Sequence, residues 1–143
     1  MDDKNILEAN KALIRRWFEE VWNQGRADAI DEMMAPGAPC HGLSDDPAQA
    51  LRGPEDFHPL HDMFRGALSN IEVVVEDAIA EGDKVVARCS VRGRHIGDHL
   101  GVAASNALVE FTGIAIGRVS DGKFVETWNN FDFLTMNQQI GKQ

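Results

Sequence analysis

The amino-acid sequence predicts an α+β protein whose helices pack on one face of a curved antiparallel sheet. The amino-terminal half carries apolar residues at helical spacing, and the carboxy-terminal half carries runs rich in Val, Ile, Phe and Thr. Two of these runs flank Ser120-Asp121-Gly122, where a glycine suits a tight hairpin turn. Helices followed by a series of antiparallel strands define this fold class.

The first predicted helix has the clearest pattern. Its apolar residues form one broad stripe, which comprises Ile6, Leu7, Ala9, Leu13, Ile14, Trp17, Phe18, Val21 and Trp22. The pattern stops near Asn23-Gln24-Gly25, and Gly25 is expected to cap the carboxyl end. A second, shorter helix is predicted from Ala27 to Met34, before Pro36.

A third helix is predicted after a long loop. Residues 35–54 are rich in proline and glycine, which predicts a loop with at most one short strand around Cys40-His41. Apolar residues from Phe57 to Leu68 then outline the helix, which Pro59 interrupts or starts. Loops of this kind often build the mouth of a pocket.

The next two predicted strands run from Ile71 to Ile79 and from Lys84 to His95. One face of the second strand carries apolar residues and ends in a histidine: Val85, Ala87, Cys89, Val91 and His95. The other face carries Arg88, Ser90, Arg92 and Arg94. The first face is therefore expected to be core or pocket, and the second to be exposed or an interface. The segment Ile96–Asn106 is predicted to be a loop.

The final hairpin is expected to form the wall of a core or a pocket. If its loop is Ser120–Gly122 with a bulge at the glycine, odd-numbered residues of both strands share one face. That face then carries Val109, Phe111, Gly113, Ala115, Gly117, Val125, Thr127, Asn129, Phe131 and Phe133. A two-residue Asp121-Gly122 turn would pair odd with even positions instead.

Composition limits the classes of function. A chain of 143 residues without linker or repeat predicts a single domain, residues 1–143. The net charge of −9 argues against nucleic acid and anionic membranes as partners. No apolar run is long enough for a membrane span, and the charged start MDDKNILEAN predicts no secretory signal and a cytoplasmic protein. Cys40 and Cys89 are expected to be buried, reduced thiols.

Several short motifs, in this order along the chain, resemble the SnoaL-like polyketide cyclases of the nuclear transport factor 2-like superfamily. They include Phe18-Glu19-Glu20-Val21-Trp22-Asn23-Gln24-Gly25, His41, Gly53-Pro54-Glu55, His95-Ile96-Gly97, Phe111-Thr112-Gly113-Ile114 and Glu126-x-Trp128. The resemblance implies a cone-shaped, strongly bent antiparallel sheet, closed by three helices of the amino-terminal half around one deep pocket. It also implies ring closure by aldol chemistry without metal or cofactor. We expect a homodimer that forms through the outer face of the sheet.

The resemblance also indicates where the acid/base residues of such cyclases stand. The family pattern has an Asp directly after the Trp of the last strand and a His on the preceding strand. Those positions are Asn129 and Ala115 here. An amide can hydrogen-bond a carbonyl or enolate oxygen, but it cannot serve as a general base. The pattern therefore predicts that the pocket is kept and the acid/base pair is not.

Other polar residues are candidates for the missing chemistry. His95 lies on the apolar side of its strand, and histidine is a common acid/base residue, so it is a candidate base or a histidine bonded at the pocket rim. Asp132 is the remaining acid near the hairpin, although its even number places it on the other face. His41 is a candidate for the lining of the pocket mouth, and the alternative is a structural role. The groups His58, His61 and Asp62, and His95, Asp98 and His99, lack metal-site spacing, so no metal is predicted.

The leading prediction is a cyclase or lyase that acts on a small hydrophobic carbonyl compound. His95 or Asp132 would be the base, and Asn129 would stabilise the enolate oxygen. The predicted substrate-binding residues are Trp17, Trp22, His41, Met63, Phe64, Val91, Phe111, Phe131 and Phe133. The alternatives are a non-catalytic binder of an apolar metabolite, and an isomerase or hydrolase with a relocated acid/base pair. The chain has no Tyr, which disfavours a ketosteroid isomerase.

Overall fold

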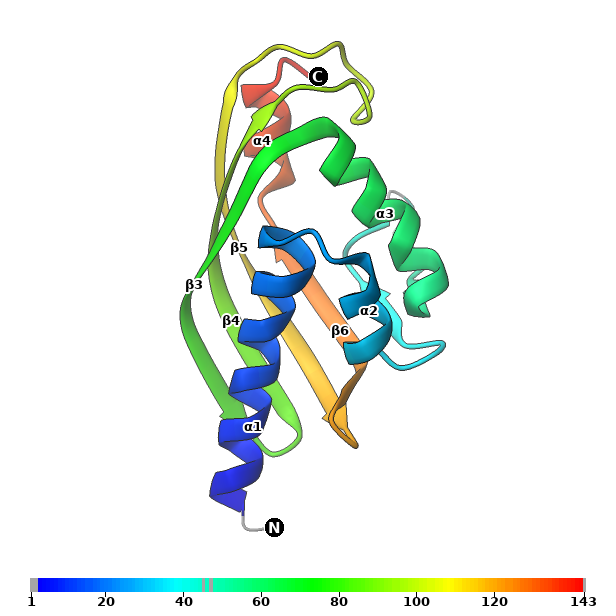
Figure 1. The fold of residues 1–143 in the computed structure, drawn as a ribbon, viewed down its shortest axis with the longest axis vertical. Helices are drawn as coiled ribbons and strands as arrows, with labels where there is room; N and C mark the ends of the chain where they lie inside the picture. The colour runs from blue at the N-terminus through cyan, green and yellow to red at the C-terminus, as the bar shows by residue number, and fades with distance from the viewer. Residues whose placement is uncertain (1–2, 45, 47, 143) are drawn as a thin grey trace.

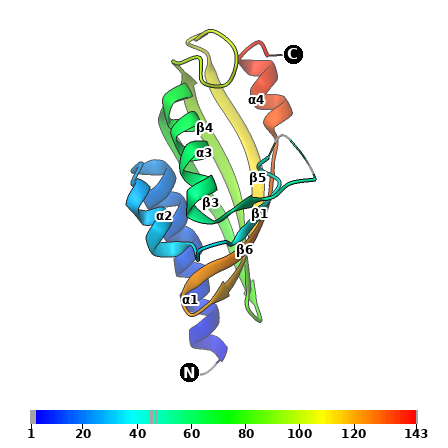
Figure 2. The same ribbon diagram turned by 90° about the vertical axis from the view of Figure 1, so that its right-hand side faces the viewer.

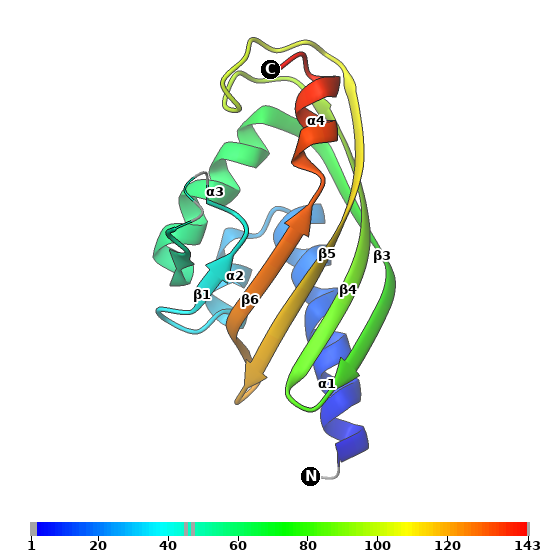
Figure 3. The same cartoon turned by 180° about the vertical axis from the view of Figure 1, so that it is seen from behind.

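The computed structural model describes residues 3–44, 46 and 48–142. Six strands form one curved sheet in the order β2-β1-β6-β5-β4-β3, and the sheet does not close on itself. The amino-terminal helices lie together on its concave side, and they leave the convex side uncovered (Figures 1 and 3). The predicted α+β fold is therefore confirmed.

The helices differ from the prediction in number and in detail. They are α1 (Asp3–Arg16), the π-helix η1 (Trp17–Asn23), α2 (Ala27–Met33), α3 (Gly53–Ala67) and α4 (Phe133–Gln139). Helix α3 starts at Gly53, with Pro54 in its first turn where a missing N–H costs little, and Pro59 lies inside it. Helix α4 corrects the sequence prediction, in which the pattern of the last strand continues through Phe133.

The strands are β1 (Pro39–His41), β2 (Leu51–Arg52), β3 (Leu68–Glu81), β4 (Lys84–His95), β5 (Leu108–Ser120) and β6 (Lys123–Phe131). All neighbours are antiparallel except β1 and β6, which run parallel. This short parallel pair brings the loop after α2 against the last strand (Figure 2). It thereby fixes the edge of the concave face.

The hairpin turn is the two-residue one, yet odd residues still pair with odd ones. Asp121 and Gly122 have φ of 51° and 76°, the left-handed values that a tight hairpin requires. An irregularity between the Arg118 and Val119 pairs then shifts the register by one residue, so that Ala115 pairs with Asn129. Consequently Phe124, and not Val125, is the buried residue nearest the turn.

Two side-chain amides complete strand edges where no strand continues. The Asn23 amide accepts from the Val73 N–H at 2.6 Å and donates to the Val73 carbonyl at 3.0 Å, on the outer strand β3. In the same way the Gln139 amide, from α4, pairs with both backbone groups of Glu110 at 2.9 and 2.8 Å. Each amide replaces a missing strand partner and so anchors a helix to the sheet.

Candidate functional site

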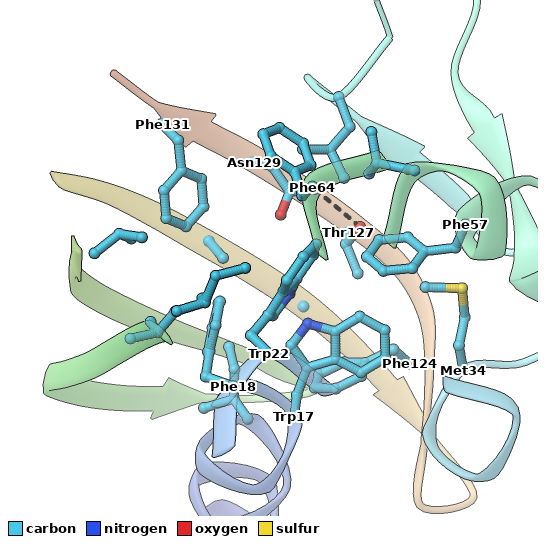
Figure 4. A pocket seen from close by; sticks show the side chains of 18 of the residues that line it. Trp17, Phe18, Trp22, Met34, Phe57, Phe64, Phe124, Thr127, Asn129 and Phe131 are labelled. Atoms are coloured by element: carbon cyan, nitrogen blue, oxygen red, sulfur yellow. Dashed lines mark hydrogen bonds between the residues drawn. The ribbon is translucent and has the colours of Figure 1, made fainter. Parts of the chain in front are cut away.

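A pocket lies between the concave face of the sheet and the amino-terminal helices (Figure 4). Its cavity volume is about 90 Å³. Eight of the residues predicted for the site line it: Trp17, Trp22, Phe64, Val91, Phe111, Asn129, Phe131 and Phe133. Among the described residues, the only polar side chains on its wall besides the two indoles are Thr127 and Asn129, and none of the lining side chains titrates near neutral pH.

The π-helix sets two tryptophans on the same wall. Five residues on an α-helix turn through 500°, which would leave Trp17 and Trp22 about 140° apart. The wider turn of η1, with its i→i+5 hydrogen bonds, brings both indoles onto the pocket side. Edge-to-face contacts with Phe57, at centroid distances of 5.1 and 6.0 Å, hold the two indoles in place.

Helix α3 fixes the end of η1 through two side chains one turn apart. His61 Nε2 donates to the Val21 carbonyl at 2.7 Å, and Arg65 donates to the Trp22 carbonyl at 2.9 Å. These bonds satisfy carbonyls that a helix end leaves open. Burial lowers the pKa of His61, which keeps the imidazole neutral beside the pocket wall. The next turn needs Gly25, because its φ of 72° is a left-handed value that favours glycine, and a Cβ there would also lie 2.5 Å from the Arg65 guanidinium.

Two glycines of β5 make room for phenylalanine rings of β6. A Cβ on Gly113 would lie 2.1 Å from the Phe131 ring, and one on Gly117 would lie 2.5 Å from the Phe124 ring. The rings therefore lie flat across the neighbouring strand and form part of the pocket wall. The small residues that the sequence places on one strand are explained by this packing.

Asn129 is half-buried on the pocket wall, and its orientation is fixed by its neighbours. Its Nδ2 donates to the His41 carbonyl oxygen at 3.0 Å and to Thr127 Oγ1 at 3.2 Å. Because a backbone carbonyl can only accept, the nitrogen of the amide must face His41. The amide oxygen then faces the pocket. This arrangement opposes the predicted role of Asn129 as a donor to an enolate oxygen.

The two positions that the family pattern gives to its acid/base pair lie side by side. Ala115 pairs directly with Asn129 across β5 and β6, and both residues line the pocket. Side chains opposite each other on an antiparallel pair have Cβ atoms about 4.5–5.5 Å apart. A His and an Asp at these positions would therefore meet inside the cavity, whereas a methyl group and an amide meet there in this chain.

His41 does not line the pocket. Its ring stacks on Trp128 with a centroid distance of 5.7 Å, and Nε2 lies 2.8 Å from a Glu126 carboxylate oxygen. Trp128 and Glu126 alternate along β6 with the pocket residues Thr127 and Asn129, so they lie on the convex face. His41 thus contributes to the site only through its backbone carbonyl.

His95 and Met63 also lie away from the pocket wall. His95 is fully buried on the concave face at the end of β4, where Nδ1 accepts from the Ser105 N–H at 3.1 Å and lies 2.8 Å from Ser105 Oγ. Nε2 has no hydrogen-bond partner among the described residues. His95 is therefore enclosed beneath the 96–106 loop and not at a pocket opening. Met63 packs half-buried against the core.

Asp132 caps a helix and is not among the residues that line the pocket. It is the N-cap of α4: its carboxylate accepts from the Thr135 N–H at 3.0 Å and from the Thr135 hydroxyl at 2.7 Å. These bonds lower the pKa of Asp132, so the exposed carboxylate is a weak base. Phe133, one residue on, turns back into the pocket and stacks on Phe64 at 5.8 Å.

The cysteines and histidines form no second site in the part of the chain that the structure describes. Cys40 and Cys89 are free and buried, and burial raises the pKa of the Cys89 thiol to about 12. No group of three or more His, Cys, Asp or Glu residues within the described ranges could hold a metal ion. The described helices are also all too short or too polar to cross a membrane.

Comparison with known proteins identifies the family. Residues 12–140 match the model of the SnoaL-like polyketide cyclases, and the chain belongs to this family. It is 30% identical to the aklanonic acid methyl ester cyclase DauD from Streptomyces sp. (strain C5), over 91% of this chain and 80% of DauD. It is equally similar, at 30% identity, to DnrD from Streptomyces peucetius, over 91% of this chain and 89% of that cyclase.

A solved structure supports the same assignment. A protein from Jannaschia sp. CCS1 that carries the SnoaL-like polyketide cyclase description superposes with a TM-score of 0.87 and 28% identity. The match covers 100% of this chain and 99% of that one. TsrD from Streptomyces laurentii has a TM-score of 0.82 and 25% identity, over 100% and 99% of the two chains. The fold that the sequence motifs indicated is confirmed.

Proposed function

We propose that this protein is a cofactor-independent cyclase that binds a small hydrophobic carbonyl compound and promotes its ring closure. The single observation that carries the proposal is the aromatic-walled pocket, which is apolar apart from Thr127, Asn129 and two indole N–H groups. Such a cavity holds a flexible apolar chain in a folded shape. Holding two reacting groups together accelerates a reaction without any acid or base.

The pocket side chains of this chain offer no general base. The mechanism that fits them is confinement of the substrate, with the carbonyl polarised by hydrogen bonds and the proton transferred to and from water. His95 and Asp132 are bonded to Ser105 and Thr135 respectively, and neither is among the residues that line the pocket. We therefore assign the substrate-binding role to Asn129 and the aromatic wall.

The first experiment is a turnover assay with the compound named for the relatives, aklanonic acid methyl ester. The protein should form the ring-closed product faster than buffer alone, as followed by chromatography and mass spectrometry. Ala115→Phe places a ring inside the pocket and should abolish the acceleration. Ile114→Phe puts the same ring on the opposite face and should preserve it. Equal rates with and without protein would overturn the cyclase proposal for this substrate.

A non-catalytic binder is the second candidate, and a specific observation favours it. The cyclase pattern places its acid/base pair where this chain has Asn129 and Ala115. A protein of this kind would take up aklanonic acid methyl ester, detected as quenching of the pocket tryptophans, and release it unchanged. Binding without any product over many hours selects this candidate.

We further propose that the protein forms a homodimer through the convex face of the sheet and resides in the cytoplasm. Support comes from an apolar row that crosses the sheet through the successive pairs Ile79–Val86 and Val86–Ile116. Ile79 is 63% exposed and nearby Ile114 is 45% exposed. The arginines of this face pair within the chain, as in the 2.7 Å contact of Arg88 with Asp77, which leaves the apolar row for a partner.

Light scattering coupled to gel filtration tests the dimer. The wild-type chain should elute at twice the monomer mass, and Ile114→Glu should shift it to the monomer. Leu134→Glu is the matched control, because Leu134 is 69% exposed but lies on α4. A monomeric wild-type protein at high concentration would contradict the proposal.

A further inference from the structure

Thr127 carries the only hydroxyl group on the pocket wall within the described part of the chain. It is half-buried and lies two residues before Asn129 on the same face of β6. Threonine suits a β-strand whether or not it has a function, so the sequence pattern does not single it out as a site residue. The structure therefore leaves one polar group of the pocket without an assigned role.

Asn129 fixes the role of this hydroxyl in their shared hydrogen bond. The Asn129 Nδ2 donates to Thr127 Oγ1 at 3.2 Å, which is the dashed line in Figure 4, and it also donates to the His41 carbonyl at 3.0 Å. Thr127 Oγ1 is thus the acceptor of the shared bond, and its own hydrogen must point elsewhere. A hydroxyl that accepts a hydrogen bond is polarised and becomes a better donor.

The protein offers the Thr127 hydrogen only a weak acceptor. Cys40 lies opposite Thr127 in the parallel β1–β6 pair, and its side chain contacts the hydroxyl. Burial raises the pKa of the Cys40 thiol, and the contact with Thr127 opposes this shift only in part, so the sulfur stays protonated. A thiol sulfur is a poor acceptor. An oxygen atom of a bound ligand would therefore take the hydrogen in its place.

The hydroxyl also lies beside the positions that the family pattern gives to its acid/base pair. Those positions are Asn129 and Ala115, which pair across β5 and β6. Asn129 uses both of its N–H groups within the protein, and Ala115 has no polar group. Trp17 and Trp22 approach from η1, on the helix side of the pocket. Thr127 is therefore the donor that the sheet side of the pocket offers.

From this arrangement we infer that Thr127 is a catalytic residue, whose hydroxyl is polarised by Asn129 and donates a hydrogen bond to the reacting carbonyl oxygen of the substrate. The inference rests on the proposed function, since it names a residue for the same ring closure. Thr127 then performs the role of donor to the enolate oxygen that the sequence predicts for Asn129.

The ring closure balances without proton transfer by Thr127. The C–H bond beside the carbonyl breaks, its proton passes to water, and the electron pair moves to the carbonyl oxygen to give an enolate. The enolate carbon then forms the C–C bond to a second carbonyl carbon, whose oxygen takes a proton from water. Thr127 keeps its own proton throughout. Its hydrogen bond strengthens as negative charge develops on the oxygen, which lowers the barrier.

Two substitutions at Thr127 test the role of the hydroxyl. Thr127→Val replaces it by a methyl group of similar size, and Thr127→Ser keeps it. Loss of one donor to a developing oxyanion costs about 10²–10³-fold in kcat, so Thr127→Val should turn over aklanonic acid methyl ester about 100-fold more slowly than the wild type. KM should change by less than about threefold, because the bond strengthens mainly in the transition state. Thr127→Ser should recover most of the activity. Thr112→Val, the same change at an exposed position of β5, should leave turnover unchanged.

A spectroscopic measurement separates this inference from the cyclase proposal. The probe is acetylnaphthalene with an isotope-labelled carbonyl, bound to the protein and measured by infrared difference spectroscopy. A hydrogen bond lowers the stretching frequency of a carbonyl group. The frequency should therefore be lower in the wild type and in Thr127→Ser than in Thr127→Val. A purely structural role of Thr127 would not move it.

The two readouts fail in different ways. Equal turnover by the wild type and Thr127→Val would overturn the inference and leave the cyclase proposal standing. Equal carbonyl frequencies in all three proteins would also overturn it, because an indole N–H would then hold the carbonyl. A frequency difference in a protein without turnover would support Thr127 as the carbonyl donor and contradict the cyclase. A wild-type protein that neither binds the ketone nor turns over the ester would overturn both.

Discussion

The two faces of the β5–β6 hairpin have opposite chemistry. The concave face, with Phe111, Ala115 and Phe131, is aromatic and small-residue surface that lines the pocket. The convex face carries the titratable and charged groups: Glu126 contacts His41 at 2.8 Å, and the Arg118 guanidinium lies 5.7 Å from the centre of the Trp128 ring. Glu126 and Arg118 therefore lie on the side away from the pocket.

This difference shows what strand alternation permits. Successive side chains of a strand point to opposite faces, so substitutions on the concave face can remove an acid and a base from the pocket without any change in fold. In this chain the cavity, the aromatic wall and the neighbouring positions 115 and 129 are all present. What this chain lacks is a titratable side chain at either of those two positions. The fold and the proton chemistry are thus separable properties.

The largest effect on activity is expected when an acid and a base are placed on the concave face. Asn129→Asp combined with Ala115→His places a carboxyl group and an imidazole on adjacent strands inside the pocket. General acid–base catalysis contributes about 10²–10⁴-fold, so the double variant should turn over aklanonic acid methyl ester about 100-fold faster than the wild type. The initial rate of product formation measures this.

The pH profile of that variant provides its control. In Asn129→Asp, a carboxyl oxygen takes the place of the amide nitrogen beside the His41 carbonyl. That contact and burial both favour the protonated acid, so the pKa of the new carboxyl should lie above that of an exposed Asp. Activity should rise with pH through this raised pKa. A correctly folded double variant that is no faster than the wild type would mean that proton transfer does not limit the reaction.

The next largest effect is expected where the loop after β1 lies against the backbone of β6. Gly42 has φ of 87°, and a Cβ there would lie 1.9 Å from the Asn129 backbone oxygen. Gly42→Ala should therefore cost about 2–4 kcal/mol, the sum of the left-handed strain and the displaced backbone. Gly122→Ala is the matched control: φ is 76° but nothing lies within 4 Å, so its cost should be near 1 kcal/mol.

Urea denaturation gives both free energies of unfolding. The Gly42→Ala variant should also lose affinity for ligand, since the same contact positions Asn129. Equal losses of stability in the two variants would show that the loop after β1 can move away without cost.

Much of this fold follows from patterns in the sequence. The stripe from Ile6 to Trp22, the strand Lys84–His95 and the odd-numbered face of the final hairpin all rest on periodicity, which tertiary structure preserves. The predicted pairing of odd-numbered with odd-numbered residues is correct, although the turn has two residues and not three. The register shift near Val119 restores this pairing. A single sequence does not reveal such a compensation.

The parts that were missed depend on contacts distant in sequence. The burial of His95 depends on Ser105 in the following loop, and the stacking of His41 on Trp128 depends on a parallel pair of strands 87 positions apart. The π-helix has no local signal, since it is stabilised by bonds from α3. One local signal exists: Asp132 is a residue type that is preferred at a helix N-cap, and it stands directly before the first residue of α4.

A smaller effect tests whether the concave side excludes charge. The pKa of His61 is lowered by burial, so the unfolded chain binds more protons than the folded one below the ordinary histidine pKa of about 6.5. Stability is therefore fully present above that pH, and part of it should be lost as the pH falls from 6.5 towards the lowered value. His61→Gln should flatten the pH dependence in this window. Thermal melts at pH 7 and pH 5.5 measure the difference, and an unchanged slope in the variant would assign it to other groups.

The smallest expected effect lies on the convex face. Glu126→Gln removes the carboxylate that contacts His41 at 2.8 Å and Arg118 at 3.7 Å. Both contacts are partly exposed, and exposed pairs of this kind are worth about 1 kcal/mol or less, so stability should fall only slightly. Turnover and ligand affinity should stay within about twofold of the wild type, because Glu126 is not among the residues that line the pocket. A tenfold loss of turnover with unchanged stability would place a convex-face acid in the reaction, and the assignment of chemistry to the concave face alone would then be wrong.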